Sequence, residues 1–143
     1  MVHGYIQQVI DNYHTGYVLD CLHEYILHCE DKTYDKNLEA GKKFYTNNFF
    51  LEGRIPKFYN NNVFPVDCTA AAQSLLTLTR FNEHTLSIKV VEYMIENMQH
   101  PKGYFYFRKY KNHTEKTSFM RWSNAWMFAG LTAVLQSQNA KRQ

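Results

Sequence analysis

The chain repeats one pattern of residues at a spacing of 56 positions, and this repeat constrains the fold more than any other feature. Asp11 begins one apolar helical pattern that reaches Leu22, and Asp67 begins another that reaches Leu78. A spacing of this size, with two helices in each unit, is typical of a repeat array. Since one unit alone cannot bury its apolar face, neighbouring units are expected to stack.

The spacing of apolar residues predicts a mostly helical chain. Steps of three and four residues, with acidic N-caps and Pro or Gly after the helix ends, indicate amphipathic helices. The expected helices cover residues 11–30, 36–47, 67–78, 82–98 and 122–138. Residues 49–65 are rich in Gly, Pro and Asn and predict a loop with short extended pieces, residues 103–110 predict an aromatic strand, and residues 111–118 predict its turn.

The distribution of charge among these helices predicts two layers. Residues 69–78 and 122–138 are nearly free of charge and are expected to form an inner layer, with the second helix buried on most sides. Residues 36–47 and 83–98 carry more charge and are expected to form an outer layer. The 143 residues suit one domain, residues 1–143, of an all-α class built from α-hairpin repeats, with short β-hairpin-like loops between helices.

The composition narrows the classes of function. Aromatic residues make up 16% of the chain, which favours either a large core or a surface that binds flat, amphipathic ligands such as sugars. The net charge of +3 is scattered along the chain, so no nucleic-acid partner is expected. Polar residues interrupt the uncharged stretch 122–140, so no membrane span is expected. Residues 1–8 show no signal peptide, and a cytoplasmic location follows.

The three cysteines are expected to be small buried side chains. Their odd number and the absence of a CxxC spacing argue against a disulfide framework and against a zinc site. They lie inside apolar helical patterns, at Cys21, Cys29 and Cys68.

Four stretches of the chain resemble a known group of proteins. They are IDNYHTGYVLDCL, GRIPKFYNNNVFPVDCTAAAQSL, GYFYFRKY and MRWSNAWMFAGL, between Val9 and Leu135. They resemble the C-terminal segment of α/α-toroid proteins of bacterial polysaccharide-biosynthesis clusters, which are related in fold to six-hairpin glycosidases and terpenoid-cyclase-like toroids. The resemblance implies an incomplete α/α-toroid, with about two and a half of six hairpins. It therefore implies either a homo-oligomer or a missing N-terminal part of a longer parent.

The resemblance also implies a ligand site at the rim where loops enter the inner helices. There, carboxylates would accept sugar hydroxyl protons and aromatic rings would stack on sugar faces. The candidates are Asp11, His14 and Asp67 for catalysis, and Tyr13, Arg54, Lys57, Tyr59, Arg121 and Trp122 for substrate binding, with Trp126 close by.

Each candidate also has a structural explanation. Asp11 and Asp67 stand at N-cap positions, and a histidine near a helix start is often simply hydrogen-bonded. Charges on the 49–65 loop are usually solvated, and the two tryptophans suit a core. Arg121 lies at the start of an uncharged helix, where a buried guanidinium would need Asp67 or an anionic ligand as its partner.

Three functions remain open from the residues. The first is a carbohydrate-related protein that binds a glycan at the rim and takes part in polysaccharide or lipopolysaccharide biosynthesis or processing. The second is a non-catalytic helical scaffold or oligomerising module, and the third is a prenyl or terpenoid toroid enzyme. The residues leave open whether the chain is an enzyme. No cofactor and no metal are expected, because the sequence has no HExxH motif and no Gly-rich phosphate loop.

Overall fold

The computed structural model describes residues 10–140, and these residues are mostly helical, as predicted. The helices are α1 (Asn12–Cys29), α2 (Asp35–Asn48), α3 (Cys68–Arg80), α4 (His84–Met98) and α5 (Trp126–Ala140), with a 3₁₀ turn η1 (Lys32–Tyr34) and a π-helical turn η2 (Met120–Ala125). The short strands are β1 (Phe50–Leu51), β2 (Ile55–Pro56), β3 (Val66–Asp67), β4 (Arg108–Lys109) and β5 (Thr114–Glu115). The expectation of no signal peptide concerns residues 1–8, which lie outside the described part.

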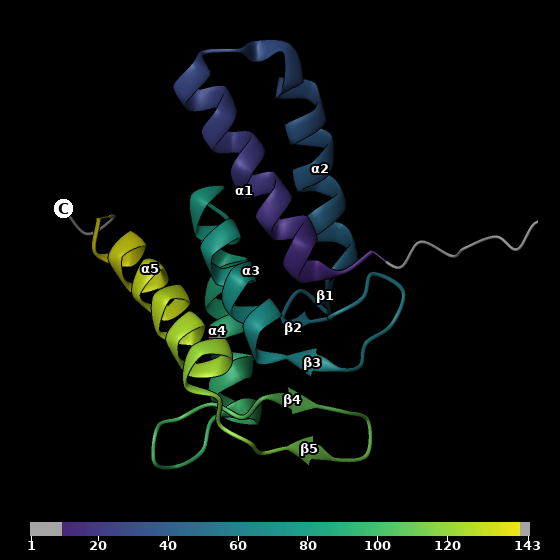
Figure 1. The fold of residues 1–143 in the computed structure, drawn as a ribbon, viewed down its shortest axis with the longest axis vertical. Helices are drawn as coiled ribbons and strands as arrows, with labels where there is room; N and C mark the ends of the chain where they lie inside the picture. The colour runs from purple at the N-terminus through teal and green to yellow at the C-terminus, as the bar shows by residue number, and fades with distance from the viewer. Residues whose placement is uncertain (1–9, 141–143) are drawn as a thin grey trace, which may run out of the picture.

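Helices α1, α3 and α5 lie in a row with α3 at its centre. Helix α3 packs most extensively against α5 and then against α1, while α2 packs on α1 and α4 packs on α3. The three helices of the row begin at the same end of the molecule, where the strands gather (Figure 1). The prediction that the two lightly charged helices, now α3 and α5, lie side by side is therefore confirmed. Among residues 10–140 no helix is long and apolar enough to cross a membrane.

The repeated aspartates begin two helices of this row. Asp11 accepts a hydrogen bond from the backbone N–H of His14, and Asp67 accepts one from the backbone N–H of Ala70. Each carboxylate satisfies an amide proton that the first helical turn leaves unpaired, which stabilises the helix start by about 1 kcal/mol. The N-cap interpretation of both residues is confirmed.

The strands form two small antiparallel sheets at the starts of these helices. β1 pairs with β2, and β4 lies between β3 and β5. The strand predicted over 103–110 is shorter than expected, because the N–H of Phe105 bonds to the Asn124 side chain and the N–H of Tyr106 to the Met98 carbonyl instead of a neighbouring strand. The predicted turn 111–118 contains β5, whose pairing with β4 makes a hairpin.

A buried polar network joins the first three helices. Tyr45 on α2 donates its hydroxyl proton to Oδ1 of Asn12, at 2.6 Å, and the Ser74 hydroxyl on α3 donates to the same oxygen at 2.9 Å. The amide of Asn12 donates to the Lys57 carbonyl at 2.9 Å. Burial raises the pKa of Tyr45 far above its ordinary value, which keeps its proton in this network. The network holds α1, α2 and α3 and the loop after β2 in one arrangement.

Helix α5 is buried on one side only, which corrects the prediction of a helix buried on most sides. Met127, Gly130 and Val134 face α3, whereas Phe128 is 73% exposed and Leu135 is 62% exposed. Helix α5 stands at the end of the row, and within the described chain no helix covers its far side. Apolar composition alone does not specify burial, because a helix hides only the faces for which it finds a neighbour.

Two of the three cysteines also differ from the prediction. Cys68 is buried at the start of α3, but Cys21 and Cys29 are exposed on α1, and all three thiols are free. Helix α1 has α2 and α3 as its packing partners, so part of its apolar pattern stays open to solvent.

Candidate ligand-binding site

A cavity of about 430 Å³ lies at the end of the molecule where α1, α3 and η2 begin, and we refer to it as the rim pocket. Its volume is within the range of about 300–1,000 Å³ found for small-molecule sites. Its lining residues are Tyr13, His14, Phe58, Asp67, Thr69, Phe107, Arg108, Trp122 and Trp126.

The backbone brings two aromatic segments to this pocket in the same way. The carbonyl of Phe58 accepts the N–H of Asn12, the first residue of α1, at 2.8 Å. The carbonyl of Phe107 accepts the N–H of Cys68, the first residue of α3, at 3.0 Å. Each phenylalanine is thus attached to the start of one helix of the row. In the sequence, Phe58 follows Gly53 and Phe107 follows Gly103, each within an aromatic extended segment.

An ion pair between Asp67 and Arg108 lies at the base of the rim pocket. The two residues face each other across the β3–β4 pairing, and Nε of Arg108 donates to Oδ2 of Asp67. Asp67 is only 3% exposed, and its other oxygen accepts the Ala70 N–H at 2.9 Å. Burial acts to lower the pKa of Arg108, but the hydrogen bonds and charges of Asp67 and Tyr110 together outweigh burial and raise it. The guanidinium of Arg108 therefore stays charged.

Aromatic rings cover the guanidinium of Arg108. It lies over the ring of Phe107, 4.7 Å from the centroid, and over the ring of Phe58 at 5.2 Å. Trp122 is 59% exposed at the edge of the pocket, which corrects the expectation that it is a core residue. Trp126 is partly buried and meets Tyr13 edge to face, with ring centroids 6.5 Å apart. The pocket therefore offers apolar ring faces next to a fixed carboxylate and a fixed guanidinium.

His14 and Asp11 form a hydrogen-bonded pair beside the pocket. Nδ1 of His14 lies 2.9 Å from Oδ2 of Asp11, and the His14 side chain is 79% exposed. Because Nδ1 is bonded to the carboxylate, Nε2 is the ring nitrogen left for a ligand. This pairing fixes the imidazole orientation in the way that catalytic histidines are often held.

The structure brings four of the nine predicted site residues into the rim pocket. These are Tyr13, His14, Asp67 and Trp122, and Asp11 stands directly behind His14. Tyr59 lies next to the pocket, paired with Asp11 through the backbone and in edge contact with the ring of Phe58.

The three predicted cations lie elsewhere. Arg54 pairs with Glu96 on α4 at 2.7 Å, and Lys57 donates to the Asn60 carbonyl at 2.6 Å. Arg121 is exposed, so the prediction of a buried guanidinium is wrong there. Asp67 takes Arg108 as its partner instead, because the register of β4 places Arg108 directly opposite it.

Sequence reasoning missed Arg108, Phe107, Phe58 and Thr69 as members of the pocket. The order of a glycine followed by an aromatic extended segment, at residues 53–59 and again at 103–110, could have indicated the two phenylalanines. Arg108 had no such signal, because its position depends on a strand pairing between residues 41 positions apart.

The described part of the chain is therefore mostly helical and has an aromatic-walled pocket with an ion pair at the end where three of its helices begin. Comparison with known protein families, with curated proteins and with solved structures finds no match to this chain. In the described part of the chain, no group of three or more His, Cys, Asp or Glu residues has the arrangement of a metal site.

Proposed function

We propose that this chain binds a glycan in the rim pocket and serves in polysaccharide or lipopolysaccharide biosynthesis or processing. The observation that carries the proposal is the Asp67–Arg108 pair set among ring faces. Sugars present apolar C–H faces that stack on aromatic rings, and hydroxyl groups that donate to carboxylates and accept from guanidinium groups. The rim pocket combines both kinds of surface in one cavity.

The proposal includes an α/α-toroid arrangement of the hairpins. Two features of the fold support it: the row of α1, α3 and α5 whose starts share one end, and the second layer of α2 and α4. The repeat of N-capping aspartates at 56 residues supports it as well. A pocket at the common end of the inner helices is where a toroid of this kind would hold its ligand.

Asp67 and His14 suit different roles in this proposal. Asp67 is already bonded to Arg108 and to the start of α3, so it is suited to orienting a hydroxyl group rather than to moving a proton. His14 is exposed and backed by Asp11, so it is the side chain in this pocket suited to proton transfer. The proposal requires binding, and catalysis by His14 would be an addition to it.

Intrinsic fluorescence tests the proposal directly, because both tryptophans of the chain line the rim pocket. A panel of neutral and charged oligosaccharides is titrated while tryptophan emission is recorded. Binding that shifts the emission is expected, and Trp122→Ala should weaken it about tenfold, or roughly 1.4 kcal/mol. Phe128→Ala is the matched control, since Phe128 is an exposed ring on α5 outside the pocket. No emission change with any sugar, or equal affinity in Trp122→Ala, would remove the proposal.

A second candidate function, a self-associating scaffold, is favoured by the apolar residues at both ends of the row. Val18 and Leu27 on α1 are 62% and 59% exposed, and Phe128 and Leu135 on α5 are 73% and 62% exposed. Exposed apolar groups of this kind often mark protein interfaces. Light scattering at micromolar concentration is expected to show a dimer or a larger species, which Phe128→Asp should reduce to a monomer. A strictly monomeric wild-type protein would exclude this function.

A further inference from the structure

A second and larger cavity, of about 660 Å³, opens between α1, α3 and α5, and we refer to it as the groove pocket. It adjoins the rim pocket, because the ring of Trp126 lines both cavities. Tyr17 of the groove pocket also stacks on Tyr13 of the rim pocket, with ring centroids 6.2 Å apart and planes 23° apart. A ligand longer than one sugar unit in the rim pocket would therefore extend past Trp126 into the groove pocket.

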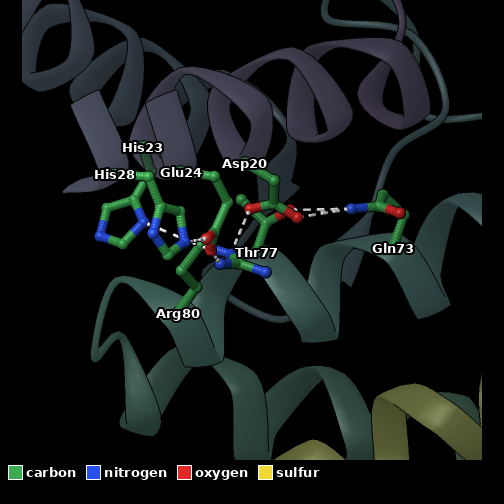
Figure 2. A network of polar contacts seen from close by, with 7 residues as sticks. All are labelled: Asp20, His23, Glu24, His28, Gln73, Thr77 and Arg80. Carbon is green, nitrogen blue, oxygen red and sulfur yellow. Dashed lines mark hydrogen bonds and ion pairs between the residues drawn. The ribbon is translucent and has the colours of Figure 1, made fainter. Parts of the chain in front are cut away.

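The groove pocket carries more negative than positive charge on its lining. One guanidinium, that of Arg80, is shared by two carboxylates: its Nε lies 3.2 Å from Oδ1 of Asp20, and its Nη1 pairs with Glu24. Figure 2 shows Arg80 reaching from α3 between the two acidic side chains of α1. The lining therefore has one carboxylate in excess.

Two histidines of α1 lie beside the Glu24 carboxylate: Nε2 of His28 is 3.1 Å from Oε2, and Nδ1 of His23 is 3.8 Å from Oε1. Burial is the main cause that lowers the pKa of His23, and the charge of Arg80 adds to it, so this imidazole is neutral at neutral pH. Lys42, whose charge also acts on His23, is paired with Glu39 on α2 at 2.7 Å.

Asp20 is the more buried of the two carboxylates, since its side chain is 14% exposed and that of Glu24 is 41% exposed. Burial raises the pKa of its carboxyl, even though Arg80, Thr77 and Gln73 all act to lower it. Gln73 donates to Oδ2 of Asp20 at 2.9 Å, but among the described residues Oδ1 is a buried atom with no aligned hydrogen bond and only the ion pair with Arg80. A positive group on a ligand would offset the charge that the protein leaves incompletely compensated.

The apolar part of the lining suits the same kind of ligand. Tyr17 is 50% exposed and Trp126 lies across the groove from it, and electron-rich ring faces attract ammonium groups as well as sugar C–H faces. We propose that the groove pocket is a second subsite that binds a protonated amino sugar, as part of a glycan whose next unit occupies the rim pocket. This proposal rests on the proposed function, since the rim pocket supplies the neighbouring subsite.

Two trisaccharides that differ in the substituent on their 2-amino groups test the proposal by calorimetry. They are the trimer of glucosamine and the trimer of N-acetylglucosamine, at about pH 6, where primary amines are protonated. The wild-type protein is expected to prefer the glucosamine trimer, and Glu24→Gln should weaken that trimer about fivefold, the effect of one partly exposed charge pair. The affinity for the acetylated trimer should stay unchanged. Glu96→Gln is the matched control, because Glu96 is an exposed glutamate on α4 that is ion-paired with Arg54, outside the groove pocket.

Equal affinity of the wild-type protein for the two trimers would overturn the proposal, and so would a Glu24→Gln variant that weakens both trimers equally. A separate titration with monomeric glucosamine distinguishes failure of the cation subsite in the groove pocket from failure of glycan binding in the rim pocket. In that titration the amide signals of Cys21 and Ala133, which line the groove pocket, should shift in the wild-type protein and not in Glu24→Gln. If the acetylated trimer fails to bind while these shifts are present, the glycan function of the rim pocket is wrong and the cation subsite stands.

Discussion

Replacing Gly130 with alanine tests the contact that holds α5 on the rest of the protein. A Cβ atom at Gly130 would lie 2.9 Å from the backbone carbonyl oxygen of Ala72 and 3.1 Å from Cβ of Leu75, both on α3. Real Cβ atoms keep a distance of about 3.4 Å or more, so α5 would have to move away by several tenths of an ångström, because the backbone of α3 is buried and fixed.

The expected size of the effect follows from two opposed contributions. Overpacking of this kind costs about 1–3 kcal/mol. Alanine in place of glycine inside a helix recovers about 1 kcal/mol. The net result for Gly130→Ala is therefore a loss of roughly 0–2 kcal/mol in the free energy of unfolding, with a fall in Tm of about 3 °C for each kcal/mol lost.

Gly41→Ala is the matched control, because it has the same helix propensity gain without the backbone contact. A Cβ at Gly41 would meet Cδ2 of Leu19 at 2.5 Å, but that methyl group is the end of a side chain that can rotate. Its stability should change by less than about 1 kcal/mol in either direction. Urea denaturation followed by circular dichroism measures both variants. If Gly130→Ala proves as stable as Gly41→Ala, α5 does not rest on the α3 backbone as described.

Two further predictions concern thiol reactivity and pH. In the native protein a thiol reagent should label Cys21 and Cys29 within minutes and Cys68 only after denaturation. The reason is that burial excludes the reagent from Cys68 and raises the pKa of its thiol. Rapid labelling of all three thiols in the native protein would contradict this prediction. For Asp20, burial raises the folded-state pKa, so ionisation of this carboxyl opposes folding. The free energy of unfolding of the wild-type protein, relative to that of Asp20→Asn, should therefore fall as the pH rises from about 4 through the raised pKa. Urea denaturation at a series of pH values measures this difference. A difference that grows with pH would show that the partners of Asp20 fully offset the cost of burying its carboxylate.

The helices and their starts follow from the amino-acid sequence because they depend on neighbours in the chain. Apolar spacing of three and four residues, and an aspartate three positions before the amide that it caps, are relations within one helical turn. They located five helices within a few residues of their observed ends, and both N-caps, Asp11 and Asp67. The π-helical turn η2 had no such local signal and was not predicted.

Long-range pairing decided which charges meet. Asp67 meets Arg108 and not Arg121, because the β3–β4 register selects one cation from a chain that has 16 lysines and arginines. In the same way Arg80 reaches two carboxylates of α1 only because α1 packs on α3.

Burial was also decided by the packing of helices rather than by residue type. Cys21 and Trp122 are apolar in character and still face solvent, since each lines an open pocket that no further element of the described chain covers. An apolar residue loses its contact with water only where another element covers it, and which elements meet is a property of the whole folded chain.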